Sequence, residues 1–585
     1  MIKNSLNILI GGEAGDGILS TGEILCKIFF EMGYGLCTYK NFPSRIRGGH
    51  TAYSVRIADD FCAGRDPEID ILVVFDSESF EIHKNELKDG SVVFYDSSKI
   101  KVLGEKPDRK NIMYYAVPFA ELASANFQKP MFKNTIAIGC IASMLNIDNK
   151  FIENGFAKSI KSKKGDDAFD MNLRACGIGA NYYNDSLKGV KNELWPSPVL
   201  KNALMMTGNE AITLGALTAG CKIAVAYPIS PATEIFESMC SLLPKYGGNV
   251  MQAEDEIAAL CAAMGGGFAG ARSMTSTSGP GISLMAEAIG LAGCAEVPVV
   301  IIDAQRPGPS TGLPTKTEQG DYYHSIFCSH GDIPRIVIIP GNLKQCFEFT
   351  VNAFNLADIY QCPVIVLSEQ ALSQNKFVAP EFDFSAVTID RGKMIGDNEL
   401  EGLNGGYLRY KFTDDGVSPR TIPGQKNGIY LCNGNEHCES GRISEDPLNR
   451  VKMMDKRQKK IESASKSKFL PQPEYFGNES AEYGVIMAGS NYETVKEAFS
   501  ILDREGANVF KAMQITALMP FPAEEVSEFC SNLKKVIVIE NNKTAQLSNI
   551  IKMNAPVHSK LRSILKYDGV ALSAKEIALA LKEVR

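Results

Sequence analysis

Short apolar runs alternate with amphipathic stretches in three parts of the chain. In the first part, apolar runs predict strands over residues 6–10, 69–75 and 91–95. The spacing of apolar positions predicts helices over residues 17–33 and 133–145. Because strands that alternate with helices tend to form parallel sheets covered by helices, we expect an α/β domain here.

The same alternation returns twice further along the chain. The second part has strand patterns over residues 223–226, 297–302 and 364–367 and a helix pattern over residues 254–266. The third part has strand patterns over residues 484–488 and 535–539, a helix pattern over residues 493–505 and a terminal helix. The pattern therefore predicts an α/β protein with three α/β domains.

Polar stretches mark the boundaries between these parts. Residues 185–200 are polar and carry prolines, which is typical of a linker. Residues 379–475 have little periodicity and are rich in Gly, Asp, Lys and Arg, with a charged run at 450–468 that we interpret as a surface helix. The predicted domains are residues 1–185, 200–378 and 476–585, with an irregular connection over 379–475.

Composition excludes several classes of partner. The 585 residues are 45% apolar and 22% charged, which is ordinary for a soluble globular protein. The net charge of −7 provides no basic surface for nucleic acid. Apolar runs stay short of the roughly 18 residues that span a bilayer, and the first residues lack a signal-peptide layout. We therefore expect a cytoplasmic protein without a membrane partner.

The cysteines are numerous but widely spaced. The chain has 15 of them and no CxxC, and the closest pair is Cys432 and Cys438. Iron–sulfur and zinc sites usually have ligand pairs that lie closer together in sequence. Cysteines within apolar patterns behave as small hydrophobic residues. We expect no metal on this chain, and buried thiols in a reducing compartment.

The loop of residues 306–315 has the strongest binding chemistry. It combines Arg306 with the hydroxyls of Ser310, Thr311 and Thr315, and its prolines and glycines exclude a helix. It follows an apolar run typical of a buried parallel strand, and open α/β sheets bind ligands at the carboxyl ends of such strands. Arg306 suits a carboxylate, which it can bind with two hydrogen bonds. An ordinary turn is the alternative.

A glycine-rich loop joins the first predicted strand to the first helix. Gly12, Gly15 and Gly17 could expose backbone N–H groups to a phosphate at the start of that helix. The spacing differs from GxGxxG, so a Rossmann dinucleotide site is poorly supported. Asp16, with Asn41 further on, is similar to the pattern by which thiamine diphosphate (ThDP) enzymes hold Mg²⁺. Close packing of strand on helix is the alternative.

Arg45 and Arg47 lie beside a glycine pair. Two cations next to backbone that a ligand can approach closely suit a phosphorylated ligand or an acidic surface. Solvated surface charge explains them equally well.

Two further segments lie at predicted strand or helix ends. Tyr227 and Ser230 come just past a strand, and prolines flank Ser230, although a plain turn would look the same. Glu254, Asp255 and Glu256 begin a helix rich in Ala and Gly. The helix dipole alone could explain these acids. A carboxylate ahead of a small-residue helix is also how ThDP enzymes contact the aminopyrimidine of the cofactor.

Together these segments resemble the 2-oxoacid:ferredoxin oxidoreductases, specifically an α subunit fused to a γ domain at its N-terminus. The resemblance covers nearly the whole chain. Two positions differ from the family pattern: Ser230 replaces a threonine, and Lys316 stands where arginine is frequent. The motifs that carry the resemblance occur in the family's order: Gly11-Gly-Glu-Ala-Gly-Asp-Gly17, Ser44-Arg-Ile-Arg-Gly-Gly49, Tyr227-Pro-Ile-Ser-Pro231, Glu256, Arg306-Pro-Gly-Pro-Ser-Thr-Gly-Leu-Pro-Thr315, Gln319-Gly-Asp321, Gly416-Val-Ser-Pro-Arg420, Glu436-His437, Pro520-Phe-Pro522 and Glu540-Asn541.

The resemblance implies a reaction and a set of partners. The reaction is CoA-dependent oxidative decarboxylation of a 2-oxoacid to an acyl-CoA, with electrons passing to ferredoxin. The second domain would be of the ThDP pyrimidine-binding type and the third of the transketolase C-terminal type. A separate β subunit would hold the ThDP diphosphate, Mg²⁺ and a [4Fe–4S] cluster, so cysteine pairs are not expected on this chain.

The resemblance also implies roles for single residues. Glu256 would activate the aminopyrimidine of ThDP. We prefer it to Glu254 because Glu-x-x-Ala with Gly265 nine residues on fits a pyrimidine-binding domain better. The residues that would bind the 2-oxoacid are Arg306, Ser230, Thr315 and Tyr227. The residues that could bind CoA phosphates or form a subunit interface are Gly12, Gly15, Gly17, Arg45 and Arg47.

Two other functions stay open at this point. The chain could be a γ–α scaffold without catalytic activity, which would be favoured if Glu256 and Arg306 lay apart. It could also be a self-contained ThDP lyase that uses the loop around Asp16 for Mg²⁺. The identity of the 2-oxoacid is not encoded in these motifs.

Overall fold

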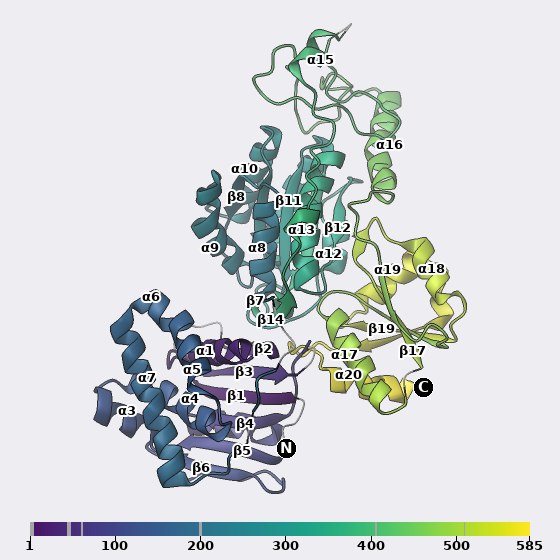
Figure 1. Cartoon of the computed structure of the whole chain (residues 1–585). Coiled ribbons are helices and arrows are strands. Elements are labelled where there is room, and N and C mark those ends of the chain that lie inside the picture. The colour runs from purple at the N-terminus through teal and green to yellow at the C-terminus, as the bar shows by residue number, and fades with distance from the viewer. Residues whose placement is uncertain are drawn as a thin grey trace. The chain divides into compact units, whose positions relative to one another are not determined.

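Three β-sheets with flanking helices organise the chain in a computed structural model (Figure 1). The structure describes residues 5–43, 48–59, 62–192, 194–197, 202–403, 406–507 and 509–584. Each predicted α/β part contributes the main strands of one sheet, so the predicted fold class is confirmed. Two compact units result, and the first consists of Met1–Met206, Asn375–Glu381 and Ser573–Leu579. No helix in the described ranges is long and apolar enough to cross a bilayer.

The sheet of the first unit has eight strands. Their order is β6 (Met113–Val117), β5 (Leu87–Asp96), β4 (Ile69–Val74), β1 (Ser5–Glu13), β3 (His50–Ala58), β2 (Gly35–Asn41), β14 (Lys376–Pro380) and β7 (Ala203–Thr207). The predicted strands β1, β4 and β5 run parallel. The antiparallel strands β2 and β3, of which β3 pairs antiparallel with β1, have no counterpart among the predicted elements. The strands β7 and β14, near the predicted boundaries at 200 and 378, extend this sheet.

Helices cover both faces of the first sheet. On one face, α1 (Ile18–Glu31), α4 (Lys133–Met144) and α7 (Asp166–Asn181) form the larger core with the alternate residues Ile8 and Ile10 of β1. On the other face, Leu9 packs in a smaller cluster that includes Phe80 of α2 (Ser77–His83). The alternation along β1 therefore buries both faces of the strand.

The predicted substrate loop begins at the end of a strand of the second sheet. Its order is β18 (Ala517–Met519), β12 (Ile336–Ile338), β13 (Pro363–Glu369), β11 (Val299–Gln305), β10 (Ser273–Thr277), β8 (Ile223–Ala226) and β9 (Asn249–Gln252). All residues of β11 are buried, and both neighbours of β11 run parallel to it. The predicted buried parallel strand is confirmed.

Helices cover both sides of the second sheet. On one side, α8 (Gly208–Thr218) and α13 (Leu343–Tyr360) pack against each other (Figure 1). On the other side, α10 (Glu256–Phe268) and α11 (Gly279–Cys294) pack through apolar residues on the face of β11 that carries Val299 and Ile301.

The third sheet has five strands. Their order is β15 (Glu474–Gly477), β17 (Phe510–Gln514), β16 (Tyr483–Met487), β19 (Lys535–Glu540) and β20 (Leu561–Leu565). The helices of this part are α17 (Asn491–Arg504), α18 (Ala523–Ser531), α19 (Gln546–Asn554) and α20 (Ala574–Val584). Residues of this part and of the second sheet share one core, which includes Ile301, Ile365, Ile486 and Val538.

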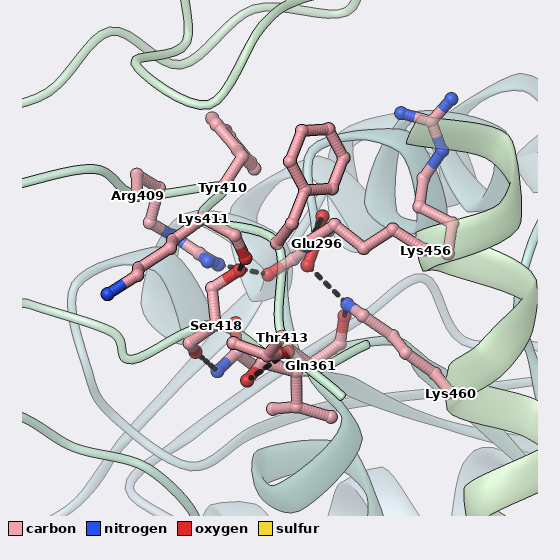
Figure 2. A network of polar contacts seen from close by, with 12 residues as sticks. Glu296, Gln361, Arg409, Tyr410, Lys411, Thr413, Ser418, Lys456 and Lys460 are labelled. Carbon is pink, nitrogen blue, oxygen red and sulfur yellow. Dashed lines mark hydrogen bonds and ion pairs between the residues drawn. The ribbon is translucent and has the colours of Figure 1, made fainter. Parts of the chain in front are cut away.

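The connection between the second and third sheets contains the helix α16 (Pro447–Ala464). The prediction of a surface helix is wrong for one face, because Lys456, Arg457 and Lys460 are buried. Glu296, which follows α11, accepts hydrogen bonds or ion pairs from Lys456 Nζ at 2.6 Å and Lys460 Nζ at 2.5 Å (Figure 2). Arg409 Nη2 donates to the backbone oxygen of Glu296 at 2.7 Å.

This network explains how charge can be buried in the connection. Burial alone would raise the pKa of Glu296, but Lys456, Lys460 and Arg409 lower it well below the usual value. Burial lowers the pKa of Lys456 to about 8, and Glu296 opposes that shift. Because a buried charge is tolerated when it is paired, the network fixes α16 to the end of α11.

Two motifs of the connection also have structural partners. Arg420 donates to Asp358 Oδ1 at 3.1 Å and to the backbone oxygen of Gly267 at 3.0 Å, near the end of α10. Glu436 accepts from Arg457 Nη2 at 2.7 Å. Arg420 therefore holds the connection against the second α/β part, whereas Glu436 pairs with α16 inside the connection.

Candidate functional site

Burial distinguishes the acidic residues at the start of α10. Glu254 is exposed, and the Asp255 carboxylate caps the helix by accepting from the Ala258 N–H at 2.8 Å. Glu256 is the first helical residue and is only 5% exposed. The helix dipole and capping account for Asp255. They do not explain why the Glu256 side chain is buried.

The side chains of Glu256 and Asp321 lie against the first turn of α11. A Cβ added to Gly281 would lie 2.8 Å from Glu256 Cγ and 1.9 Å from Thr277 Oγ1. A Cβ added to Gly279 would lie 2.6 Å from Asp321 Oδ2. Only glycine allows the backbone of this turn to approach these groups so closely.

Arg306 follows β11 directly and joins this group of acids. It is 7% exposed, and its Nη1 donates to the backbone oxygen of Ser230 at 2.7 Å. Burial lowers the pKa of Arg306, while the nearby carboxylates of Asp321 and Glu256 oppose that shift. Its Nε is buried without a hydrogen-bond partner among the described residues. The structure therefore brings Arg306, Ser230 and Glu256 together.

The rest of the loop is held in a compact turn. Leu313 N donates to the oxygen of Pro307 at 3.0 Å. Gly312 has φ 53°, and a Cβ there would lie 1.7 Å from the same oxygen, so the turn requires glycine. Thr315 is buried in this loop, whereas Tyr227 is 40% exposed on the loop after β8.

A pair of buried aspartates beside Arg306 was not among the predicted site residues. Asp303 on β11 is fully buried, and burial followed by the charge of Asp321 raises its pKa well above the usual value. Burial and Glu318 raise the pKa of Asp321 to about 7, against the effect of Arg306. The sequence signals were an acid at the end of an apolar run and the Gln319-Gly-Asp321 motif.

Gln319 fixes the segment before Asp321 to the third α/β part. Its Nε2 donates to Glu369 Oε1 at 2.9 Å and to the Ala488 oxygen at 3.0 Å. Its Oε1 accepts from Asn541 N at 3.0 Å. One buried amide thus joins β13, the end of β16 and the Glu540-Asn541 motif, and it holds the chain close to the site.

The glycine-rich loop of the first unit has a different arrangement. Gly15 and Gly17 have φ of 100° and 83°, and Gly12 packs against Ile18. Asp16 Oδ2 forms an ion pair with Nζ of the buried Lys133 at 2.5 Å, so the charge of this carboxylate is already neutralised. Arg45 and Arg47 lie outside the described residues.

Metal-binding geometry is not found in the described part of the chain. No group of three or more His, Cys, Asp or Glu side chains there could hold a metal ion.

Comparisons with known proteins cover nearly the whole chain. Residues 7–182 match the family "Pyruvate ferredoxin/flavodoxin oxidoreductase". Residues 214–456 match "Pyruvate flavodoxin/ferredoxin oxidoreductase, thiamine diP-bdg". Residues 481–577 match "Pyruvate:ferredoxin oxidoreductase core domain II".

Similar proteins extend over full length. The α subunit of 2-oxoacid:ferredoxin oxidoreductase 2 from Aeropyrum pernix is 30% identical, over 99% of this chain and 97% of its own. An α subunit from Sulfolobus sp is 31% identical over the same shares. A solved structure of 2-oxoglutarate:ferredoxin oxidoreductase from Magnetococcus marinus is 34% identical over 100% of both chains, with a TM-score of 0.91. That structure has 2-oxoglutarate, coenzyme A and succinyl-CoA bound.

These matches agree with the motif order and with the α/β architecture of the three sheets. The family that the motifs indicated is therefore confirmed: the chain belongs to the 2-oxoacid:ferredoxin oxidoreductases and is an enzyme subunit of their α type.

Proposed function

We propose that this chain, with a separate β subunit, converts a 2-oxoacid and CoA to an acyl-CoA and CO₂ and passes the electrons to ferredoxin. The observation that carries the proposal is the buried Arg306, whose Nε lacks a partner in the described structure, beside the buried Glu256. ThDP would supply the electron sink for decarboxylation when bound. Mg²⁺, the ThDP diphosphate and a [4Fe–4S] cluster would be held by the β subunit.

Glu256 is the residue that would act on the aminopyrimidine of ThDP. Its carboxylate lies against Gly281, in a space that a Cβ at that position would fill. A buried carboxylate can accept a hydrogen bond from a ring nitrogen and hold or release that proton. Asp255 is committed to the helix cap, and Glu254 faces solvent, so neither fits this role.

Arg306 is the residue that would bind the 2-oxoacid carboxylate. Nη1 is already held by the Ser230 oxygen, which orients the guanidinium and leaves Nε for a ligand. The exposed Ser230 hydroxyl and the buried Thr315 would contribute at the keto oxygen, and Tyr227 would line the entrance. A planar, forked donor suits a carboxylate better than a point charge does.

The β subunit would cover apolar side chains around this site. The elements and loops that carry Glu256, Arg306 and Asp321, or that contact or directly precede them, also expose large hydrophobic residues at 40–54% of their surface: Tyr227, Met251, Ile257, Leu284, Leu313 and Phe327. Such groups of exposed apolar residues mark protein interfaces. An interface here would also shield the site from water.

The division of labour along the chain follows the predicted domains. We assign residues 1–185 as the γ-like domain, residues 200–378 as the pyrimidine-binding domain and residues 476–585 as the transketolase C-terminal-like domain, with 379–475 as the connection between the last two. In the γ-like domain, Gly12, Gly15, Gly17, Arg45 and Arg47 would serve CoA phosphates or a subunit interface.

Two alternatives are less well supported. A self-contained lyase would need the carboxylate of Asp16 for Mg²⁺, but Lys133 already pairs with it. A scaffold without catalytic activity would not need Arg306 and Glu256 as buried neighbours, and burying such charges costs free energy.

The test is reconstitution of the complete enzyme. The chain is co-purified with its β subunit, and reduction of a viologen is measured with pyruvate, 2-oxoglutarate and a branched-chain 2-oxoacid. We expect reduction that requires both a 2-oxoacid and CoA and that yields the matching acyl-CoA. ThDP-dependent cleavage without an electron acceptor would favour the lyase, and no activity in a complete, cofactor-loaded complex would favour the scaffold.

A further inference from the structure

Asp303 and Asp321 are two buried carboxyl groups with too few hydrogen-bond partners. Both Oδ atoms of Asp303 and Oδ2 of Asp321 are buried without a partner among the described residues. Asp303 is held by its strand, since it pairs with Thr277 of β10 and Leu367 of β13. An isolated, ionised carboxylate is costly in such a place. Two neighbouring carboxyl groups therefore retain at least one proton between them.

The backbone around Asp321 fixes its side chain beside Arg306. Asp321 N donates to Gln305 Oε1 at 3.0 Å, and Gln305 directly precedes Arg306. Gln319 binds the preceding segment to three other elements. Gly279 leaves the space that the Asp321 carboxylate fills. Asp321 is thus placed by several independent contacts, although its own Oδ2 makes no hydrogen bond in the described structure.

The charged groups around Asp321 come from several elements. Asp303 faces it from β11, Arg306 and Glu318 from the loop between β11 and α12 (Tyr322–Phe327), and Glu256 from α10 through its common neighbour Arg306. On α12, His324 is directed to Ser283 Oγ, at 3.1 Å from its Nε2. Arg306 is the cation that acts on Asp321.

We propose that Asp321 is a positioning residue that controls how freely Arg306 can bind the carboxylate of the 2-oxoacid. When Asp321 carries its proton, the guanidinium of Arg306 is available to the substrate. When Asp321 ionises, it competes with the substrate for the same cation and repels the incoming anion. This inference rests on the proposed substrate role of Arg306.

Competition between Asp321 and the substrate for Arg306 should become stronger as the pH rises. Burial and Glu318 raise the pKa of Asp321 to about 7, and Arg306 opposes the shift. Below that pH the acid is neutral and the substrate binds well, and above it the substrate can bind only if Asp321 takes up a proton. For one linked proton, KM rises by a factor of about 8 between pH 6.5 and 8. The rate at saturating substrate changes less.

The first test is the pH profile of KM in the assembled enzyme. Asp321→Asn removes the titration and keeps the shape, so we expect KM to stay within about twofold of its low-pH value from pH 6.5 to 8. The exposed Asp332→Asn is the matched control and should keep the wild-type rise. A folded Asp321→Asn enzyme that keeps the wild-type rise would overturn the proposal. A KM of Asp321→Asn that is raised at every pH would also overturn the proposal, because Asp321 would then help Arg306 to bind the substrate rather than compete with it.

The second test needs no variant. Binding of an unreactive N-oxalyl analogue (oxamate for pyruvate, N-oxalylglycine for 2-oxoglutarate) to the wild-type enzyme is measured by calorimetry in buffers of different ionisation enthalpy. We expect uptake of nearly one proton at pH 8 and almost none at pH 6. No uptake at pH 8 would contradict the proposal. If the enzyme has no 2-oxoacid activity at all, the proposed function fails, whereas activity with a flat KM profile removes only the role of Asp321.

Discussion

Single acidic residues differ sharply in burial although they are neighbours in sequence. Glu254 is exposed, Asp255 caps α10, and Glu256 is buried against the first turn of α11. The spacing to the following small residues differs for each acid and led to the prediction of Glu256, which is also the buried acid of the three. The pair of Asp303 and Asp321 could not be predicted, because their proximity depends on two backbone segments that meet only in the fold.

Glu256→Gln should lower turnover strongly without unfolding the assembled enzyme. An amide cannot exchange the proton that a carboxyl group holds, and loss of a catalytic acid or base typically costs about 10²–10⁴-fold in rate. Glu254→Gln is the matched control and should keep near-wild-type rates, because Glu254 faces solvent. The measurement is kcat for viologen reduction, with thermal unfolding as the check on folding. The reverse ranking would transfer the role to Glu254.

Arg306→Ala should lower kcat/KM for every 2-oxoacid by the same factor, since all share the C1 carboxylate. Truncating one partner of a buried charge pair costs roughly 2–5 kcal/mol. Arg306→Lys should recover only part of the kcat/KM that Arg306→Ala loses, because an ammonium cannot make two parallel hydrogen bonds. Steady-state kinetics on at least two 2-oxoacids provides the test. A loss confined to a dicarboxylic substrate would assign Arg306 to the side chain of that substrate instead.

Elements with strong local patterns were predictable, and elements that depend on distant partners were not. The strand β11 was evident from its apolar run because both of its faces are buried. Helix α16 looked like a solvated helix, because its lysines gave no sign that Glu296 lies next to them in the fold. The strands β2 and β3 were missed because their composition is mixed and they are stabilised by pairing, β3 with β1 and β2 with β3.

Glu296→Gln should destabilise the part of the protein that contains α16. It would leave Lys456 and Lys460 buried without a counter-charge, and breaking a buried ion pair on one side typically costs about 3–5 kcal/mol. Glu462→Gln on the exposed face of the same helix is the control and should have little effect. Hydrogen exchange in α16 and thermal unfolding measure the difference. Equal stability of the two variants would show that the network does not stabilise the fold.

At the scale of the whole molecule, the proposed function gives the chain one side of a catalytic site. The chain has three sheets of α/β architecture, and we propose that the buried polar residues at the end of β11 bind and orient a ligand. The sequence has no CxxC, and the described residues contain no cluster suited to a metal. In the proposed reaction, the β subunit would hold the electron-transfer centre.

The isolated chain should consequently contain no stoichiometric iron–sulfur cluster and should not reduce a viologen with any 2-oxoacid. Adding the β subunit should restore both the visible absorbance of the cluster and the activity, because the ligands of the cluster and the site for the ThDP diphosphate would come from that subunit. Iron analysis, absorption spectra and viologen assays on the chain alone and on the complex make the comparison. The Glu256→Gln complex is the matched control, since it should keep the cluster and lose turnover. Cluster absorbance in the isolated chain would overturn this division between the subunits, and turnover by the isolated chain would show that one polypeptide holds the complete site.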